Sequence, residues 1–273
     1  MISYSKKIKQ SIIIIFIYLL GILYFFPILY TFLTSFKTEA NVVPPSIIFI
    51  PTLESYSIVL KSKIWPYVEN SVIVTTVTAL LALVIGIPAS YNLVFSKIKK
   101  SQNILFWFIS TNLLPPVAIA IPIFLIFSYL HLLDSRVALI IVYTAISIPI
   151  VVWMTRSFLL EIPRDILEAA SIDGCTKLRT FFYIILPLIK MGITSAALLV
   201  IIFTWNDFFF ALNLTYVNAQ TLPVYMATFM TKQGFFWAQL SAISTICMLP
   251  PLILGWISQK ALVRGLTMGA VKG

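Results

Sequence analysis

The residues whose chemistry could support catalysis are few in this chain, and they do not cluster. Among 273 residues there are nine acidic side chains and a single histidine, His131. No serine, histidine and acid, and no pair of carboxylates, is placed as a nucleophilic or acid–base site requires. A lone histidine without cysteine or acidic neighbours predicts no metal site. Without a GxxxxGK[ST] phosphate loop the chain is not expected to bind ATP. We therefore expect neither an enzyme nor a bound cofactor.

The richest concentration of charge lies in residues 156–187, which contain the sequence EAASIDG. Pro163 suits the first turn of a short helix, and Asp165 and Glu168 then complement the positive end of its dipole. Gly174 suits the end of that helix, because glycine readily adopts the left-handed conformation found there.

A second short helix is predicted after this glycine. Thr176 is a candidate N-cap, and the helix must end near Leu186 because Pro187 follows. The small Ala169 and Ala170 would let another surface approach closely. The segment is then either a knob that docks into a groove or an ordinary amphipathic loop on a membrane surface, and these physical features favour neither.

The composition predicts that the elements on either side of this segment span a membrane. The chain is 60% apolar and 10% charged, whereas a soluble domain carries about 25% charged residues. A membrane span needs about 20 mostly apolar residues. Five stretches contain no charge and are candidate spans: Ser11–Phe36, Asn70–Ser96, Ser101–Leu130, Val137–Thr155 and Gln233–Gln259. A sixth candidate span, Leu188–Phe210, has Lys190 and Asp207 near its ends.

Basic residues orient these spans. With the N-terminus inside, 14 of the 19 Lys and Arg residues fall on the cytoplasmic side, as the positive-inside rule favours. This accounts for the net charge of +10 without nucleic-acid binding. The first apolar run is too long for a signal peptide, so we expect a retained first helix.

We therefore predict an all-α, polytopic membrane helix bundle with about six transmembrane helices. It forms a single transmembrane domain over residues 1–273, with the two-helix cytoplasmic loop at about 161–187 and a cytoplasmic tail at about 260–273. Both termini are expected in the cytoplasm and the chain in the cytoplasmic membrane. Cys175 falls on the cytoplasmic side and Cys247 inside the last span, so no disulfide is expected.

Four stretches of the sequence resemble the permease subunits of bacterial ABC importers. EAASIDG, followed 12 residues later by Leu186-Pro187, resembles their EAA loop. The others resemble the sugar-importer branch, in the subunit type of the maltose permease's second membrane protein: NSVIVT from Asn70, WNDFFFALNLT from Trp205 with TLPVYM from Thr221, and LVRGLTMGAVKG from Leu262. Together and in this order they are highly specific, and they run from about residue 70 to the C-terminus.

This resemblance implies a set of partners. These are a second homologous permease forming a heterodimer, two ATP-binding subunits, an extracellular solute-binding protein, a sugar substrate and membrane lipid. The sugar, whether mono- or oligosaccharide or a polyol, is not identified. The residues implied to couple to the ATPase are Glu168, Ala169, Ala170, Asp173 and Gly174. Those of the tail implied to contact the ATPase dimer are Arg264, Gly265 and Gly269.

Individual residues still have two interpretations each. For Glu168 we favour docking over a solvated loop acid, and for Gly174 a helix corner over a flexible filler. Asn206 and Asp207 lie at the predicted outer end of a span, so an interface anchor or structural hydrogen bond is favoured over a solute contact. Trp205 is more often an interfacial aromatic than a sugar platform. A place in the translocation path remains open for these three.

Two other classes of function compete with the permease subunit. A stand-alone channel or carrier would transport by itself, but the mid-spans lack the ionisable residues of a proton-coupled carrier, and we detect no repeat. A polytopic membrane enzyme would need a polar constellation that the sequence does not contain. Co-purification with an ATPase and a binding protein would favour the permease subunit.

Overall fold

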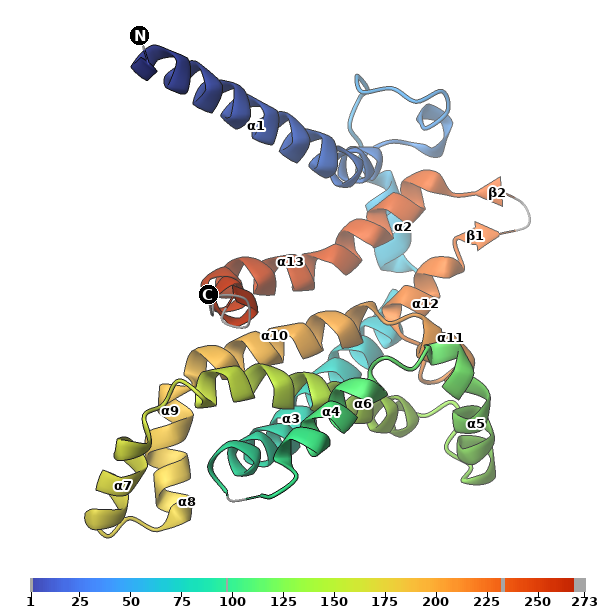
Figure 1. Cartoon of the computed structure of the whole chain (residues 1–273). Coiled ribbons are helices and arrows are strands. Elements are labelled where there is room, and N and C mark those ends of the chain that lie inside the picture. Colours follow the sequence, from blue (N-terminus) through green and yellow to red (C-terminus); the bar gives the residue numbers. More distant parts are fainter. Residues whose placement is uncertain (1, 97, 232–233, 268–273) are drawn as a thin grey trace. The chain divides into compact units, whose positions relative to one another are not determined.

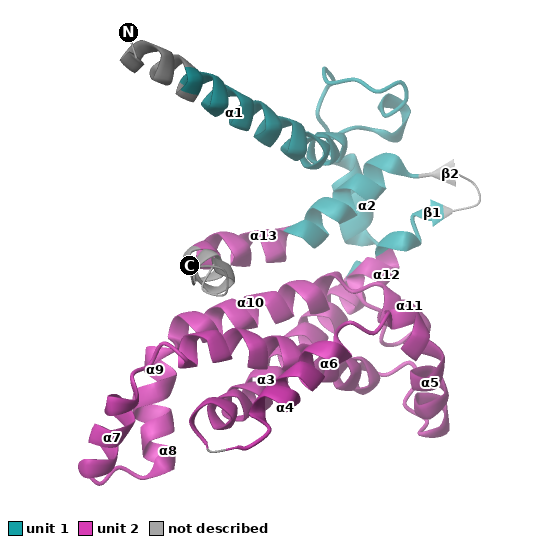
Figure 2. Cartoon of the chain, in the orientation of Figure 1, with its two compact units in different colours: residues 1–64, 226–248 teal, residues 65–225, 249–273 magenta. Residues whose placement is uncertain are grey.

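The computed structural model describes residues 2–96, 98–231 and 234–267 (Figure 1). Its contacts divide the chain into two compact units, which Figure 2 colours separately. Unit 1 contains Met1–Ile64 and Met226–Met248, and unit 2 contains Trp65–Tyr225 and Leu249–Gly273. Each unit is described by itself below.

Within the described residues, four helices are long and apolar enough to cross a membrane. Two further pairs of helices pass the same test together but are bent, and counting each pair as one span gives six. This confirms the predicted multi-span, all-helical class. The four long helices are α1 (Ile2–Thr34), α3 (Ile64–Phe95), α6 (Arg136–Leu159) and α13 (Trp237–Thr267).

The first bent pair consists of α4 (Ser101–Thr111) and α5 (Pro116–Tyr129), which meet at 88°. The sequence presents them as one uncharged stretch. The chain breaks there because Pro115 is extended, with ψ of 130°, and Pro116 opens the next helix. Neither proline has an N–H with which to continue α4.

The second bent pair meets at 76°, between Lys177–Leu188 and α10 (Lys190–Asn206). The first member is built from α8 (Lys177–Thr180), a π-helical turn over Phe181–Ile185, and α9 (Leu186–Leu188). The predicted sixth span therefore corresponds to α10, and the helical segment before it belongs to the charged loop.

Unit 1 contains α1, the 3-10 turn η1 (Glu39–Asn41), α2 (Glu54–Lys61) and a short antiparallel hairpin. The hairpin pairs β1 (Met230–Thr231) with β2 (Gly234–Phe235) in the register Met230↔Phe235. The carboxylate of Glu39 accepts hydrogen bonds from the backbone N–H groups of Ala238 and Gln239, at 3.1 and 2.9 Å. Glu39 thus caps the first turn of α13 with a negative charge.

Close packing of α6 against α10 and α3 forms one core of unit 2. A Cβ at Gly192 would lie 2.5 Å from the ring of Phe158, and one at Gly86 would lie 2.7 Å from Val151. These glycines let the helices approach closely, as small residues do between membrane helices. The buried residues of this core include Ala82, Val151, Met154, Ala196 and Val200.

Residues 213–231, between α10 and α13, form more than a connecting loop. They contain the end of α11 (Phe209–Leu214), all of α12 (Leu222–Ala227) and β1. Leu214 and Leu222 are each 1% exposed. Their burial shows that this segment packs into the protein and does not simply join two spans.

Candidate coupling loop and solute path

The charged loop begins with α7 (Arg164–Ile172), preceded by Pro163 in an extended conformation. At its end Gly174 has φ of +74°. The N–H of Gly174 donates to the carbonyl of Ser171 at 3.1 Å, and the N–H of Cys175 donates to the carbonyl of Ala170 at 2.9 Å. This pair of bonds is a Schellman motif, which requires the left-handed residue. The predicted glycine corner is thus confirmed in backbone detail.

The second helix of the loop starts as expected but continues further. The hydroxyl of Thr176 accepts a hydrogen bond from the N–H of Arg179 at 3.3 Å and caps α8. The predicted end near Leu186 is wrong, because α9 includes Pro187 and the break falls at Ile189. Pro187 lies at the start of α9, immediately after the π-helical turn, where the donor that proline lacks is not needed.

Most of the proposed docking residues lie on the surface of the loop. Glu168, Ala169, Asp173 and Gly174 are exposed, whereas Ala170 is only 3% exposed and packs inward. Two large apolar side chains near the corner face outward: Ile172 is 86% exposed and Leu178 is 71% exposed. The tip of the loop therefore presents two exposed, large apolar side chains beside its acids.

The proposed tail residues are only partly described. Arg264 and Gly265 lie in the last turns of α13, and Gly269 lies outside the described residues.

The three residues at the C-terminal end of α10 take different roles. Asp207 accepts hydrogen bonds at Oδ1 from the hydroxyl of Tyr143 at 2.7 Å and from the N–H of Phe210 at 3.0 Å. Asn206 is exposed and donates to the carbonyl of Ile202 at 2.8 Å. Trp205 is 6% exposed. Asp207 thus links α10 to α6 and to the start of α11.

Asp207 also lines an open cavity of about 590 Å³ in unit 2. Residues from α4, α5, α6 and α10 surround it. Most are apolar, and the polar ones include Asn112, Ser147 and Thr204. Volume and lining fall within the range of small-molecule sites, which are mostly apolar with a few placed polar groups.

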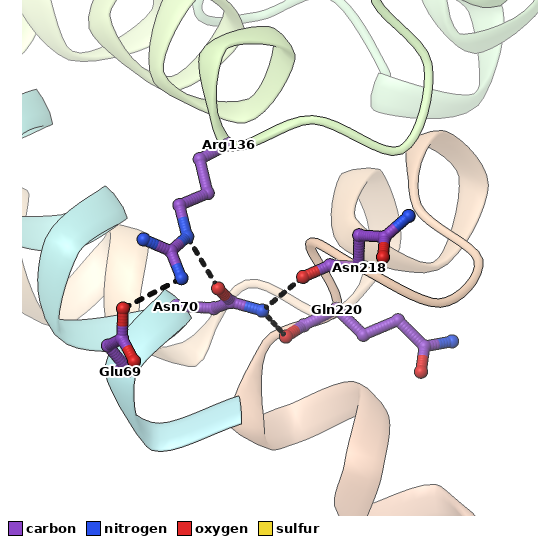
Figure 3. A network of polar contacts seen from close by, with 5 residues as sticks. All are labelled: Glu69, Asn70, Arg136, Asn218 and Gln220. Atoms are coloured by element: carbon purple, nitrogen blue, oxygen red, sulfur yellow. Dashed lines mark hydrogen bonds and ion pairs between the residues drawn. The ribbon is translucent and has the colours of Figure 1, made fainter. Parts of the chain in front are cut away.

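A second polar cluster joins segments that are far apart in the sequence (Figure 3). Asn70, in α3, accepts a hydrogen bond from Arg136 Nε at 2.6 Å and donates to the carbonyls of Asn218 and Gln220 at 2.9 and 2.8 Å. Arg136 also pairs with Glu69 at 2.9 Å. The sequence analysis did not single out this cluster, although Asn70 opens one of the four stretches quoted above.

Asp134 holds the same segment from the other side. Its carboxylate accepts hydrogen bonds from the backbone N–H groups of Tyr216, Val217, Asn218 and Ala219, at 2.9 to 3.2 Å. Partial burial raises the pKa of Asp134, but the four N–H donors outweigh it and lower the pKa from 3.8 to about 2. The carboxylate is therefore held in its charged form.

Helical spans, a two-helix loop and an apolar cavity define a polytopic α-helical membrane protein. A sequence profile of the binding-protein-dependent transport system inner membrane components matches residues 82–267, and the chain belongs to this family.

Named relatives align with nearly the whole chain. The Probable ABC transporter permease protein y4oR of Sinorhizobium fredii is 34% identical over 98% of this chain and 98% of its own length. The sulfoquinovosyl glycerol transport system permease protein SmoH of Agrobacterium fabrum is 34% identical over 91% and 89%. The diacetylchitobiose uptake system permease protein DasC of Streptomyces coelicolor is 31% identical over 91% and 92%.

A solved structure has the same fold. A chain in the crystal structure of a bacterial ABC transporter involved in the import of the acidic polysaccharide alginate superposes with a TM-score of 0.79. It is 24% identical, and the match covers 94% of this chain and 97% of that chain. The similarity extends the family assignment to the three-dimensional arrangement.

Proposed function

We propose that this chain is the transmembrane permease subunit of an ATP-driven importer for a sugar, oligosaccharide or polyol. It forms the translocation path with a second homologous permease, and two partner ATPases hydrolyse the ATP. The observation that carries this proposal is the cytoplasmic loop with its Schellman corner, exposed acids and outward-facing Ile172 and Leu178. The sugar class is supported by the relatives that transport sulfoquinovosyl glycerol and diacetylchitobiose.

The mechanism follows from a rigid loop on rigid spans. Closure of the ATPase dimer moves the loop around Gly174. The spans then rock as rigid bodies, and the translocation path opens to the outside. Solute then enters from an extracellular binding protein that contacts the segment between α11 and α13. Reversing a 1:99 equilibrium requires about 5.5 kcal/mol of differential binding. In this arrangement residues 1–273 act as one permease domain, with both termini in the cytoplasm and the tail near Arg264 reaching toward the ATPases.

The test is reconstitution. This chain, purified with its co-isolating partners and placed in liposomes, should take up sugar only with ATP inside and loaded binding protein outside. The chain alone should neither hydrolyse ATP nor move sugar. Sugar flux into liposomes that contain only this subunit would contradict the proposal, and so would failure of an ATPase to co-purify with it.

A further inference from the structure

The cavity in unit 2 contains two buried hydroxyl groups with unusual surroundings. Ser147 of α6 is 3% exposed and Thr204 of α10 is 6% exposed, and both line the cavity. No hydrogen bond of either hydroxyl is found among the described residues. Neither hydroxyl belongs to the fully enclosed polar atoms without a partner, so both retain access to the cavity.

Other hydroxyl groups on the same two helices fall into two sets. That of Thr144 on α6 is fully enclosed and has no partner among the described residues, whereas others bond to the backbone of their own helix. Thr155 of α6 donates to the carbonyl of Val151 at 2.7 Å, and Thr194 of α10 donates to the carbonyl of Lys190 at 2.9 Å. This bond to the carbonyl four residues back is the usual solution where no water is available. Among the described residues, the hydroxyl groups of Ser147 and Thr204 do not make this backbone hydrogen bond, so they can bond to a ligand in the cavity.

Asp207 and Asn112 add further polar groups to the cavity lining. The hydrogen bonds to Asp207 from Tyr143 and Phe210 both go to Oδ1, and the backbone N–H of Ala211 also interacts with this carboxylate. A carboxylate has about four acceptor positions, so it can still accept from a further hydroxyl group. Asn112 contributes a carboxamide, which both donates and accepts, at the break between α4 and α5. Aromatic side chains of Tyr143, Phe203 and Phe210 supply apolar surface to the same cavity.

The depth of these groups fits a transport pathway. Ser147 lies 11 residues from the first residue of α6, or about 16 Å along a helix that rises 1.5 Å per residue. This is about half of the ~30 Å hydrocarbon core. Thr204 and Asp207 lie closer to the end of α10, so the cavity carries hydrogen-bonding groups from mid-membrane toward that end. This suits a ligand that carries many hydroxyl groups and would otherwise have to cross an apolar layer.

The geometry points to a solute subsite on this subunit, in which Ser147, Thr204 and Asp207 bind the hydroxyl groups of a passing sugar or polyol. Asn112 lines the same cavity, and the aromatic rings contact the apolar faces of the solute. This inference rests on the proposed function, and it assigns part of the recognition of the solute to this chain. Removing a hydroxyl partner should then loosen the coupling between solute movement and ATP use.

The test uses the complete transporter in liposomes, with maltose, diacetylchitobiose and sulfoquinovosyl glycerol as separate probes supplied with loaded binding protein. The double variant Ser147→Ala/Thr204→Val keeps side-chain volume nearly constant. It should lower the sugar moved per ATP hydrolysed about ten-fold, the size expected for one or two lost hydrogen bonds. The matched controls Ser157→Ala on α6 and Thr194→Val on α10 replace hydroxyls outside the cavity lining and should leave this ratio unchanged.

Three other outcomes overturn the idea in distinguishable ways. A wild-type ratio in the double variant, with normal co-purification of the partners, removes the subsite and leaves the proposed function intact. A parallel fall of uptake and ATP hydrolysis assigns the two hydroxyls a merely structural role and likewise removes the subsite. Failure of the wild-type complex to move these probes or any other sugar or polyol carried by its binding protein contradicts the proposed function itself and the subsite with it.

Discussion

The carboxamide of Asn70 joins Arg136 to the segment between α11 and α12 (Figure 3). Its oxygen accepts from the Arg136 guanidinium, and its nitrogen donates to the carbonyls of Asn218 and Gln220. Asn70 is 1% exposed. The Asn70 side chain thus links the start of α6, the N-terminal part of α3 and the segment after α11.

Replacing Asn70 should therefore cost much more than breaking the neighbouring ion pair. Asn70→Leu keeps the volume but leaves Arg136 Nε and two carbonyls without this partner, and it should destabilise the protein by about 2–4 kcal/mol. Glu69→Gln breaks a pair whose side chains are 38% and 60% exposed, and it should change stability by about 0.5 kcal/mol or less. Unfolding titrations in SDS of the purified variants measure both effects. Equal losses would show that the ion pair, and not the carboxamide, carries the cluster.

Asp134 predicts a stability difference that depends on pH. Its pKa in the folded chain is about 2, compared with an ordinary value of 3.8. Because the folded pKa is the lower one, the carboxylate stabilises the fold above pH 3.8, and this contribution is lost as pH falls toward 2. Asp134→Asn should therefore lower the melting temperature between about pH 4 and 7, where the carboxylate of the wild-type protein is charged. Tryptophan fluorescence follows the unfolding. The two proteins should converge below about pH 3. A difference that stays constant down to pH 2 would assign the effect to shape and not to charge.

The spans and the loop corner were accessible from the sequence because their signals are local. Runs such as Asn70–Ser96 lack charge over their whole length, and Gly174 marks a backbone conformation that few other residues adopt. The 88° bend after α4 was harder to foresee. The prolines show where the chain breaks, but packing of α5 onto α6 and α11 sets the angle.

The polar clusters had no such signal. Asn70 and Arg136 are 66 residues apart, and Asp134 meets Asn218 across 84 residues. A single asparagine or aspartate near the end of a span is common, and only the folded chain shows which backbone groups it binds. The sequence also carries no signal that Ser147 and Thr204 line a common cavity, because this depends on how α6 packs against α10. The helix end near Leu186 was predicted from Pro187 alone, and the π-helical turn over Phe181–Ile185 before it was not foreseen.

The orientation of the chain predicts which introduced cysteines react from outside. In a background with Cys175→Ser and Cys247→Ala, the variants Lys177→Cys and Val217→Cys each introduce one thiol. Lys177 is exposed on the loop proposed to face the cytoplasm, and Val217 is 75% exposed in the segment proposed to lie outside. An impermeant thiol reagent applied to intact cells should label Val217→Cys and spare Lys177→Cys. Permeabilised cells, the control for accessibility, should show labelling of both. Labelling of Lys177→Cys in intact cells would reverse the assigned topology.

The glycine corner permits a test that separates backbone strain from a blocked contact. A Cβ at Gly174 would meet nothing within 4 Å in this chain, so a larger side chain has room before any partner binds. The φ of +74° nevertheless strains most residues, and asparagine tolerates it best. Gly174→Asn should therefore keep the corner and weaken assembly only slightly, whereas Gly174→Arg should strongly reduce co-purification of the ATPase subunit.

Charge at the same surface gives the companion prediction. Glu168 is exposed on α7, so Glu168→Lys should leave insertion and thermal stability unchanged. If Glu168 meets a donor on the ATPase, charge reversal at the desolvated contact should cost binding by about 2–5 kcal/mol. Glu161→Lys, which changes an exposed acid before α7, is the matched control and should have a smaller effect.

The measurements are co-purification of the ATPase and ATP hydrolysis stimulated by loaded binding protein. Wild-type values for both Gly174→Arg and Glu168→Lys would show that this loop does not couple ATP hydrolysis to transport, because these two changes alter the exposed tip without entering a membrane span.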